Sequence, residues 1–233
     1  MIELHQFSPI NGYNLSPFCY KVEVYCQLAN IPYTVVFSMP NKAPKGKLPF
    51  IVDDSRTIAD SGFILDYLKE TYGDTLDFSL SEEQKALGHL VRKVCEESLL
   101  FPILYSRWID DVAWPKFQRL VFASLPSILQ YIVPGILRRQ LRKSLYAQGV
   151  GRHSRDEIYA LGKADLKAIE FFIGKNTFIV SDHPTSYDAV VFAFLSTLVC
   201  LDIPSPLRDF IERSSKLKEY IARMETYLKS VKT

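Results

Sequence analysis

The chain has 233 residues, of which 48% are hydrophobic and 23% charged, values typical of a globular protein with one large or two small domains. A formal net charge of +2 gives no reason to expect a nucleic acid as a partner. The sequence has no signal-peptide pattern, no apolar run near the roughly 18 residues that span a bilayer and no compact cysteine framework, so we expect a cytoplasmic protein with reduced thiols.

The first 40 residues alternate between strand and helix patterns. Residues 2–7 and 33–37 are rich in apolar and β-branched side chains, which favours strands. Between them, residues 17–30 place apolar side chains on one helical face and leave Lys21 outside that face. A strand, a helix and a second strand in so short a segment predict a βαβ unit with parallel strands.

The next segment predicts a hairpin followed by a second helix. Pro49 is compatible with a strand over residues 48–52, because the start of a strand can spare a backbone N–H. Residues 57–59 can pair back on that strand as a hairpin. Asp60-Ser61 then caps a helix that ends before Gly73.

After this helix the strand patterns stop. Residues 76–80 suit a linker, so we predict a small α/β domain over residues 1–75 and an all-α domain over residues 81–233. Pro102 is expected to kink or interrupt the first long helix of the second domain. Residues 114–147 are expected to be divided into helical pieces by Pro115, Pro126 and Pro134, and a last helix is expected over residues 215–229. Capping boxes are expected at three helix starts: Ser81 with Gln84, Ser154 with Glu157 and Thr185 with Asp188.

The stretch Ser16-Pro17-Phe18-Cys19 opens the first predicted helix. Ser is a favoured N-cap and Pro is favoured at the first helical position. A helix start exposes unpaired N–H groups and a partial positive charge, which can stabilise the anion of a hydroxyl or thiol held there. Ser16 and Cys19 are therefore candidate catalytic residues, but a capping role for Ser16 and core packing for Cys19 explain them equally simply.

Four elements together resemble the glutathione S-transferase fold, whose first domain is thioredoxin-like. Ser16-Pro17-Phe18-Cys19 is similar to a Cys-Pro-x-Cys redox motif with Ser in place of the first Cys. Leu48-Pro49 stands where the family has a cis-proline, Asp60-Ser61 resembles its γ-glutamyl-binding pair, and Thr185 with Asp188 resembles its buried capping box. Residues 44–51, 58–61 and 148–154 look most like the Fax (failed axon connections) and metaxin-related branch, which includes bacterial members.

The resemblance implies a glutathione-binding protein and, in the family, a homodimer. Ser16 would stabilise the glutathione thiolate, and the backbone beside Pro49 at Leu48 would pair with the cysteinyl unit. Ser61 and Asp60 would bind the γ-glutamyl end. Lys45 or Lys47 would bind the glycyl carboxylate. Tyr105 and Trp108 would line an apolar co-substrate pocket, although aromatic residues at helical spacing also suit core packing.

Three functions stay open from the residues alone. The first is conjugation of glutathione to an apolar electrophile, and the second is a non-catalytic interaction or targeting module like the metaxins. The third is thiol chemistry that depends on Cys19, which Ser16 at the attacking position argues against. The four histidines show no metal spacing, so no metal is expected, and the basic run at residues 138–143 reads as a solvated helix face, with no membrane contact expected.

Overall fold

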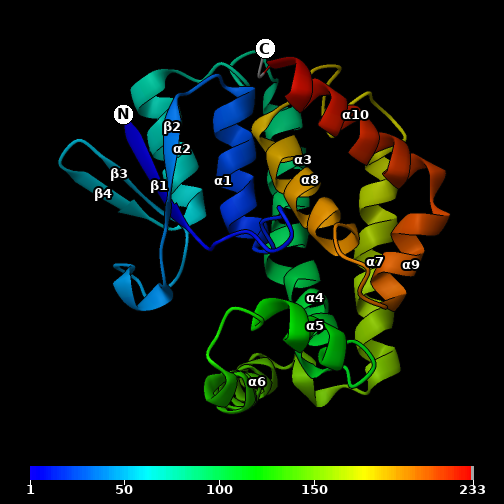
Figure 1. Cartoon of the computed structure of the whole chain (residues 1–233). Coiled ribbons are helices and arrows are strands. Elements are labelled where there is room, and N and C mark those ends of the chain that lie inside the picture. Colours follow the sequence, from blue (N-terminus) through cyan, green and yellow to red (C-terminus); the bar gives the residue numbers. More distant parts are fainter. Residues whose placement is uncertain (232–233) are drawn as a thin grey trace.

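The N-terminal part of the chain forms a four-stranded sheet with two helices (Figure 1). In the computed structural model, which describes residues 1–231, the strand order is β2-β1-β3-β4. β1 pairs with β2 in parallel, and β3 and β4 form a hairpin, both as predicted, while β1 also pairs with β3 in antiparallel orientation. The elements are β1 (Ile2–Gln6), α1 (Pro17–Leu28), β2 (Tyr33–Phe37), the short helix η1 (Pro40–Lys42), β3 (Phe50–Asp53), β4 (Arg56–Ala59) and α2 (Ser61–Tyr72).

The rest of the chain is helical, which confirms the predicted combination of a thioredoxin-like α/β part and an all-α part. The helical backbone continues through Pro102, which lies within α4, and two π-helical segments, η2 and η3, lie on either side of α4. No helix within residues 1–231 is long and apolar enough to cross a membrane. The elements are α3 (Glu82–Lys93), η2 (Val94–Leu99), α4 (Leu100–Leu104), η3 (Tyr105–Ile109), α5 (Trp114–Val121), α6 (Ser127–Gln148), η4 (Val150–Arg152), α7 (Arg155–Ile173), α8 (Ser186–Val199), α9 (Pro206–Arg213) and α10 (Ser215–Val231).

α1 is buried on more than one side, because it lies between the sheet and α8 (Figure 1). Val22, Val24 and Tyr25 are all fully buried in the main core. The expectation that Lys21 lies outside the apolar face, toward solvent, was wrong, since its side chain is also completely buried. The sequence pattern of α1 describes one apolar face, whereas the helix has neighbours on both sides.

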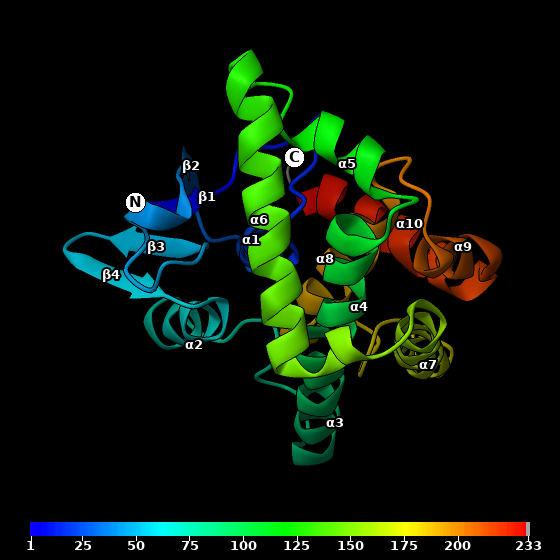
Figure 2. The same cartoon turned by 90° about the horizontal axis from the view of Figure 1, so that it is seen from below.

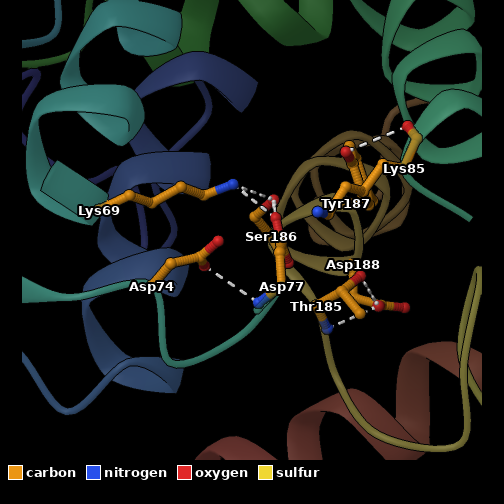
Figure 3. A network of polar contacts seen from close by, with 8 residues as sticks. All are labelled: Lys69, Asp74, Asp77, Lys85, Thr185, Ser186, Tyr187 and Asp188. Carbon is orange, nitrogen blue, oxygen red and sulfur yellow. Dashed lines mark hydrogen bonds and ion pairs between the residues drawn. The ribbon is translucent and has the colours of Figure 1, made fainter. Parts of the chain in front are cut away.

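α8 is the central helix of the helical part, and polar contacts fix its start (Figure 3). The backbone N–H of Thr185 donates to Oδ2 of Asp188 at 2.9 Å, which is one of the two hydrogen bonds of the predicted capping box, and the Thr185 hydroxyl donates to the same oxygen at 2.7 Å. Oδ1 of the fully buried Asp188 accepts from the backbone of Ile179 at 3.0 Å and from the hydroxyl of Tyr220 at 2.9 Å. Burial raises the pKa of Asp188.

The predicted linker over residues 76–80 lies between α2 and α3 and is anchored to the start of α8 (Figure 3). Oδ1 of the buried Asp77 accepts from the backbone N–H of Ser186 at 2.8 Å, and Oδ2 accepts from Lys69 Nζ at 2.5 Å. Leu76 and Leu80 are buried in the main core. The connection between the two parts is therefore a packed and hydrogen-bonded segment.

α6 is a single helix of 22 residues, so the prediction that Pro134 divides it was wrong. Proline lacks the N–H that would donate to the carbonyl of residue 130. That carbonyl, of Gln130, accepts instead from Gln118 Nε2 on α5 at 3.4 Å. Figure 2 shows α6 lying across one face of the molecule, with the end nearer α5 projecting beyond its neighbours.

Candidate functional site

The start of α1 is held in place by both parts of the chain. Oγ of the half-buried Ser16 accepts from the backbone N–H of Cys19 at 3.3 Å, which makes Ser16 the N-cap. The backbone N–H of Ser16 donates to Oδ1 of Asn14 at 3.1 Å. The carbonyl of Leu15 accepts from Arg107 of η3 at 2.8 Å, so the helical part fixes the residue before the cap.

Cys19 is a packing residue in this structure. Its side chain is fully buried in a small cluster with Ala43, Leu48, Phe50 and Ala59. Burial raises the pKa of its thiol to about 11, although the Ser16 side chain acts in the opposite direction. A thiol with a raised pKa holds little thiolate at neutral pH, so the environment of Cys19 opposes the nucleophilic role considered from sequence. The cluster instead brings three segments together at the start of α1.

The peptide bond between Leu48 and Pro49 is cis. The side chain of Leu48 is buried against Cys19, but its backbone is unused. Neither the N–H nor the carbonyl of Leu48 makes a hydrogen bond with any part of residues 1–231. A free backbone donor and acceptor on one residue are what an added peptide strand needs for pairing.

The start of α2 has an unusual backbone at Asp60. Its φ is +89°, although it is not glycine, and its Oδ1 accepts from the backbone N–H of Gly62 at 2.8 Å. A non-glycine residue with positive φ is uncommon, and such strain is concentrated at functional sites. Ser61 follows as the first helical residue and is buried, while Asp60 is exposed.

Lys45 and Lys47 are both exposed in the loop before β3. The ammonium of Lys45 lies 4.7 Å from the ring centre of Phe63, in the first turn of α2. This contact brings the loop of Lys45 to the helix start formed by Asp60 and Ser61. No contact of this kind is made by Lys47 within the described part of the chain.

A buried charge network behind this helix start was missed from sequence. Nζ of Lys21 lies 2.6 Å from Oε1 of Glu96, and Nε of Arg92 lies 3.0 Å from Oε2 of the same carboxylate. Burial lowers the pKa of Lys21 to about 8, against the attraction of Glu96. Burial alone would raise the pKa of Glu96, but Lys21 and Arg92 outweigh it and lower the pKa.

Arg92 carries this network to the start of α2. A β-carbon at Gly62 would lie only 2.3 Å from Nη2 of Arg92, so the guanidinium lies directly against this residue. Within residues 1–231 the two terminal nitrogens of Arg92 have no hydrogen-bond acceptor. One sequence signal could have indicated this charge network. Arg92 and Glu96 are oppositely charged residues spaced i and i+4 within an apolar helical pattern.

Tyr105 and Trp108 belong to two different clusters. Tyr105 packs edge-on against Tyr159, with ring centres 6.0 Å apart, at the border of the main core. Trp108 packs against Phe117 at 5.1 Å in a second cluster that also contacts Leu15. Both side chains are half-buried. Only Trp108 therefore belongs to the aromatic group that reaches the segment before Ser16.

The structure thus groups most of the predicted glutathione-binding residues. The cluster around Cys19 connects the helix start at Ser16 with Leu48 and with Ala59, the residue before Asp60. Arg92 and Lys45 approach the same start of α2 from other elements. The site combines two helix starts, an unpaired stretch of backbone and cations on two sides, features that suit an extended anionic peptide.

Comparisons with known proteins agree with this arrangement. The family model of the glutathione S-transferase N-terminal domain matches residues 17–113, and that of the C-terminal domain matches residues 162–224. The solved glutathione transferase BmGSTD1 of Bombyx mori superposes with a TM-score of 0.62 at 13% identity, covering 99% of this chain and 89% of that one.

Sequence relatives include both enzymes and proteins without an enzymatic name. Failed axon connections of Drosophila melanogaster is 35% identical over 97% of this chain, which spans only 57% of that protein. Isoprene-epoxide--glutathione S-transferase of Rhodococcus sp. (strain AD45) is 28% identical over 96% of this chain and 98% of its own length. Human metaxin-2 is 24% identical over 88% of this chain and 80% of its own length. The chain therefore belongs to the glutathione S-transferase superfamily and fits its Fax- and metaxin-related branch.

Proposed function

We propose that this protein binds glutathione and conjugates it to an apolar electrophile, with the hydroxyl of Ser16 stabilising the thiolate. The observation that carries the proposal is the grouping of Ser16, the unpaired backbone of Leu48 and the strained start of α2 at Asp60. A relative that is matched over 98% of its own length and is named isoprene-epoxide--glutathione S-transferase supports the reaction class. The partial positive charge of the α1 start adds to the hydrogen bond from Ser16 in favouring the anion.

In this proposal each part of glutathione has its own contacts. The cysteinyl unit pairs with the Leu48 backbone, and its sulfur approaches Ser16 at the start of α1. The γ-glutamyl carboxylate binds the Ser61 end of α2, where Arg92 supplies a guanidinium with free donors. The glycyl carboxylate is left to Lys45 or Lys47, and the electrophile to the apolar surface that contains Trp108.

The test compares Ser16→Ala with Ser16→Gly. Both remove the hydroxyl, but glycine is nearly as good an N-cap as serine, whereas alanine costs about 1 kcal/mol of stability. Loss of a hydrogen bond to a charged group costs about 1.5–3 kcal/mol, so the rate of conjugation with an aliphatic epoxide should fall roughly 10- to 100-fold in both. Cys19→Ser is the matched control, and it should keep most of the rate.

The opposite result would separate capping from chemistry. If Ser16 only caps α1, the Ala variant loses stability, the Gly variant loses little, and both conjugate as fast as the unmodified protein. Binding is tested separately, by retention on immobilised glutathione and by the rise in melting temperature with millimolar glutathione. Arg92→Gln should raise KM for glutathione about tenfold while kcat stays close to its original value.

A non-catalytic interaction module is the second candidate function. The observation that favours it is α6, in which Ile128 and Tyr131 are 74% and 81% exposed. The relatives named Failed axon connections and metaxin-2 are consistent with this alternative. Retention on immobilised glutathione without conjugation of any tested epoxide or aryl halide would favour a binding module over an enzyme.

A further inference from the structure

A cavity of about 400 Å³ lies apart from the candidate glutathione site. It is bounded by β1 and β2, the loop over residues 7–14, the outer side of α1, the end of α8 and α10. None of Ser16, Leu48, Pro49, Asp60 or Ser61 lines it. Its volume lies within the range of sites that hold small organic ligands.

The walls of this cavity are aromatic and acidic. Four aromatic side chains and two carboxylates contribute to it: Phe7, Tyr13, Tyr20, Phe37, Glu23 and Glu225. None of the described residues that line it is lysine, arginine or histidine. Both carboxylates act on the same phenol, because burial first and then Glu23 and Glu225 raise the pKa of Tyr20 to about 12. An aromatic wall beside a carboxylate favours a positively charged guest.

Glu23 is the carboxylate best fixed for this purpose. Its Oε2 accepts from Gln6 Nε2 at 3.0 Å, and Oε1 of Gln6 accepts from Asn14 Nδ2 at 2.8 Å. Gln6 is buried, so this chain of side chains holds the Glu23 carboxylate at the cavity wall before any ligand arrives. Within residues 1–231, Oε1 of Glu23 accepts no hydrogen bond. A pre-positioned carboxylate with an unpaired oxygen can attract an organic cation without first having to be ordered.

Glu23 is the main anionic group of the cavity, because no described cation neutralises it. Arg107 lies behind the wall formed by α8 and donates to the carbonyl oxygens of Leu15 and Thr197, without lining the cavity. Glu225 is exposed to solvent, and Lys229 lies one turn beyond it on α10. Glu23 has no cation within ion-pair distance in residues 1–231.

We propose that this cavity is a second ligand site, specific for small organic cations with an aromatic or apolar body. The ammonium group pairs with Glu23, and the body packs against Tyr20 and Phe37. The proposal does not depend on glutathione binding, because it uses a different set of residues.

In the experiment, benzyltrimethylammonium is titrated calorimetrically into the full chain in the absence of glutathione. Benzyl alcohol is titrated in the same way as the uncharged counterpart. The cation is expected to bind saturably and at least tenfold more tightly than the alcohol. Glu23→Gln keeps the size and the hydrogen bond from Gln6 but removes the charge, and it should weaken cation binding about tenfold. Phe37 is 58% exposed, so Phe37→Ala should leave the fold intact, and it should weaken the binding of both probes.

Glu219→Gln is the matched control, since Glu219 is an exposed acid of α10 that does not line the cavity. It should bind the cation as tightly as the unmodified chain. Equal affinity for the cation and the alcohol would overturn the proposal. So would a Glu23→Gln variant that keeps the original affinity, or an equal loss in Glu219→Gln, which would show diffuse attraction to surface acids.

Discussion

α8 and α6 are both rich in apolar residues, yet the fold uses them in opposite ways. Of the 14 residues of α8, 12 are buried, including the start of the helix at Ser186 and Asp188. Of the 22 residues of α6, only Pro134 and Leu145 are buried. Apolar content alone therefore does not decide burial. Burial depends on the number of neighbouring elements. α8 is surrounded by elements of both parts of the chain, whereas α6 mainly contacts η3 and η4.

The two helix starts differ in the same way. α8 begins with a buried carboxylate that accepts four hydrogen bonds, and α6 begins at Pro126 without a side-chain cap. The exposed side of α6 is apolar in its first half, at Ile128, Tyr131 and Ile132, and basic later, at Arg139 and Arg142. A helix with few buried residues but with a large exposed apolar surface suits contact with a partner. We therefore expect substitutions in α8 to lower the stability of the protein and substitutions on the exposed face of α6 to affect the binding of a partner.

The largest loss of stability is expected for Asp188→Ala, at the start of α8. The substitution leaves the Thr185 backbone N–H and hydroxyl and the Ile179 N–H without their acceptor. The Tyr220 hydroxyl keeps only its longer hydrogen bond, at 3.4 Å, to the backbone carbonyl of residue 188. Each buried unsatisfied group costs about 1–3 kcal/mol, so a loss above about 4 kcal/mol is expected in urea denaturation. Asp209→Ala, an exposed acid in the first turn of α9, should cost no more than about 1 kcal/mol. A small loss for Asp188→Ala would show that α8 is not the structural centre.

Much of this architecture could be predicted from local sequence signals. The three capping boxes, the parallel β1–β2 pair and the hairpin at β3 and β4 depend on residues that are close in sequence. The grouping of Ser16, Leu48, Asp60 and Ser61 was available only through the family resemblance, which supplies the tertiary arrangement that spacing cannot.

The features that were missed or predicted wrongly have one cause in common, because each depends on a partner residue outside its own segment. Lys21 was placed outside the core because its burial depends on Glu96, which lies 75 residues away. The role of Asp77 depends on Ser186, 109 residues away. Pro134 was expected to end a helix because nothing local indicates that Gln118 satisfies the freed carbonyl of Gln130.

A second prediction concerns the charge network that joins α1 to the helical part. Glu96→Gln leaves the fully buried ammonium of Lys21 without a counter-charge, so a loss of about 3–5 kcal/mol in the free energy of unfolding is expected. The double variant Lys21→Met with Glu96→Leu removes both charges and should recover a large part of that loss. If the double variant is no more stable than Glu96→Gln, the cost lies in packing or in Arg92, and the uncompensated ammonium is not its source.

A third prediction is the pH dependence that Lys21 contributes. Its pKa in the folded protein is lowered to about 8 from an ordinary 10.5, so between these values the unfolded chain binds more protons at this group. Stability from Lys21 therefore rises with pH across that window. Buried thiols such as Cys19, whose pKa is raised from 9.0 to about 11, act in the opposite direction above pH 9. The measurable quantity is the difference in unfolding free energy between the unmodified chain and Lys21→Met, which should rise from pH 8 to 10.5; a flat difference would contradict the lowered pKa.

The smallest effect on stability is expected at α6. Replacing Ile128, Tyr131 and Ile132 together by serine removes side chains that are 74%, 81% and 52% exposed, so the unfolding free energy should change by no more than about 0.5 kcal/mol. By contrast, the single change Leu195→Ala in α8 should cost about 2–5 kcal/mol, because that side chain is fully buried. A triple variant that loses as much as Leu195→Ala would mean that α6 is covered in solution. Sedimentation of the unmodified chain would then show an assembly that the variant lacks, and α6 would join α8 as a helix on which stability depends.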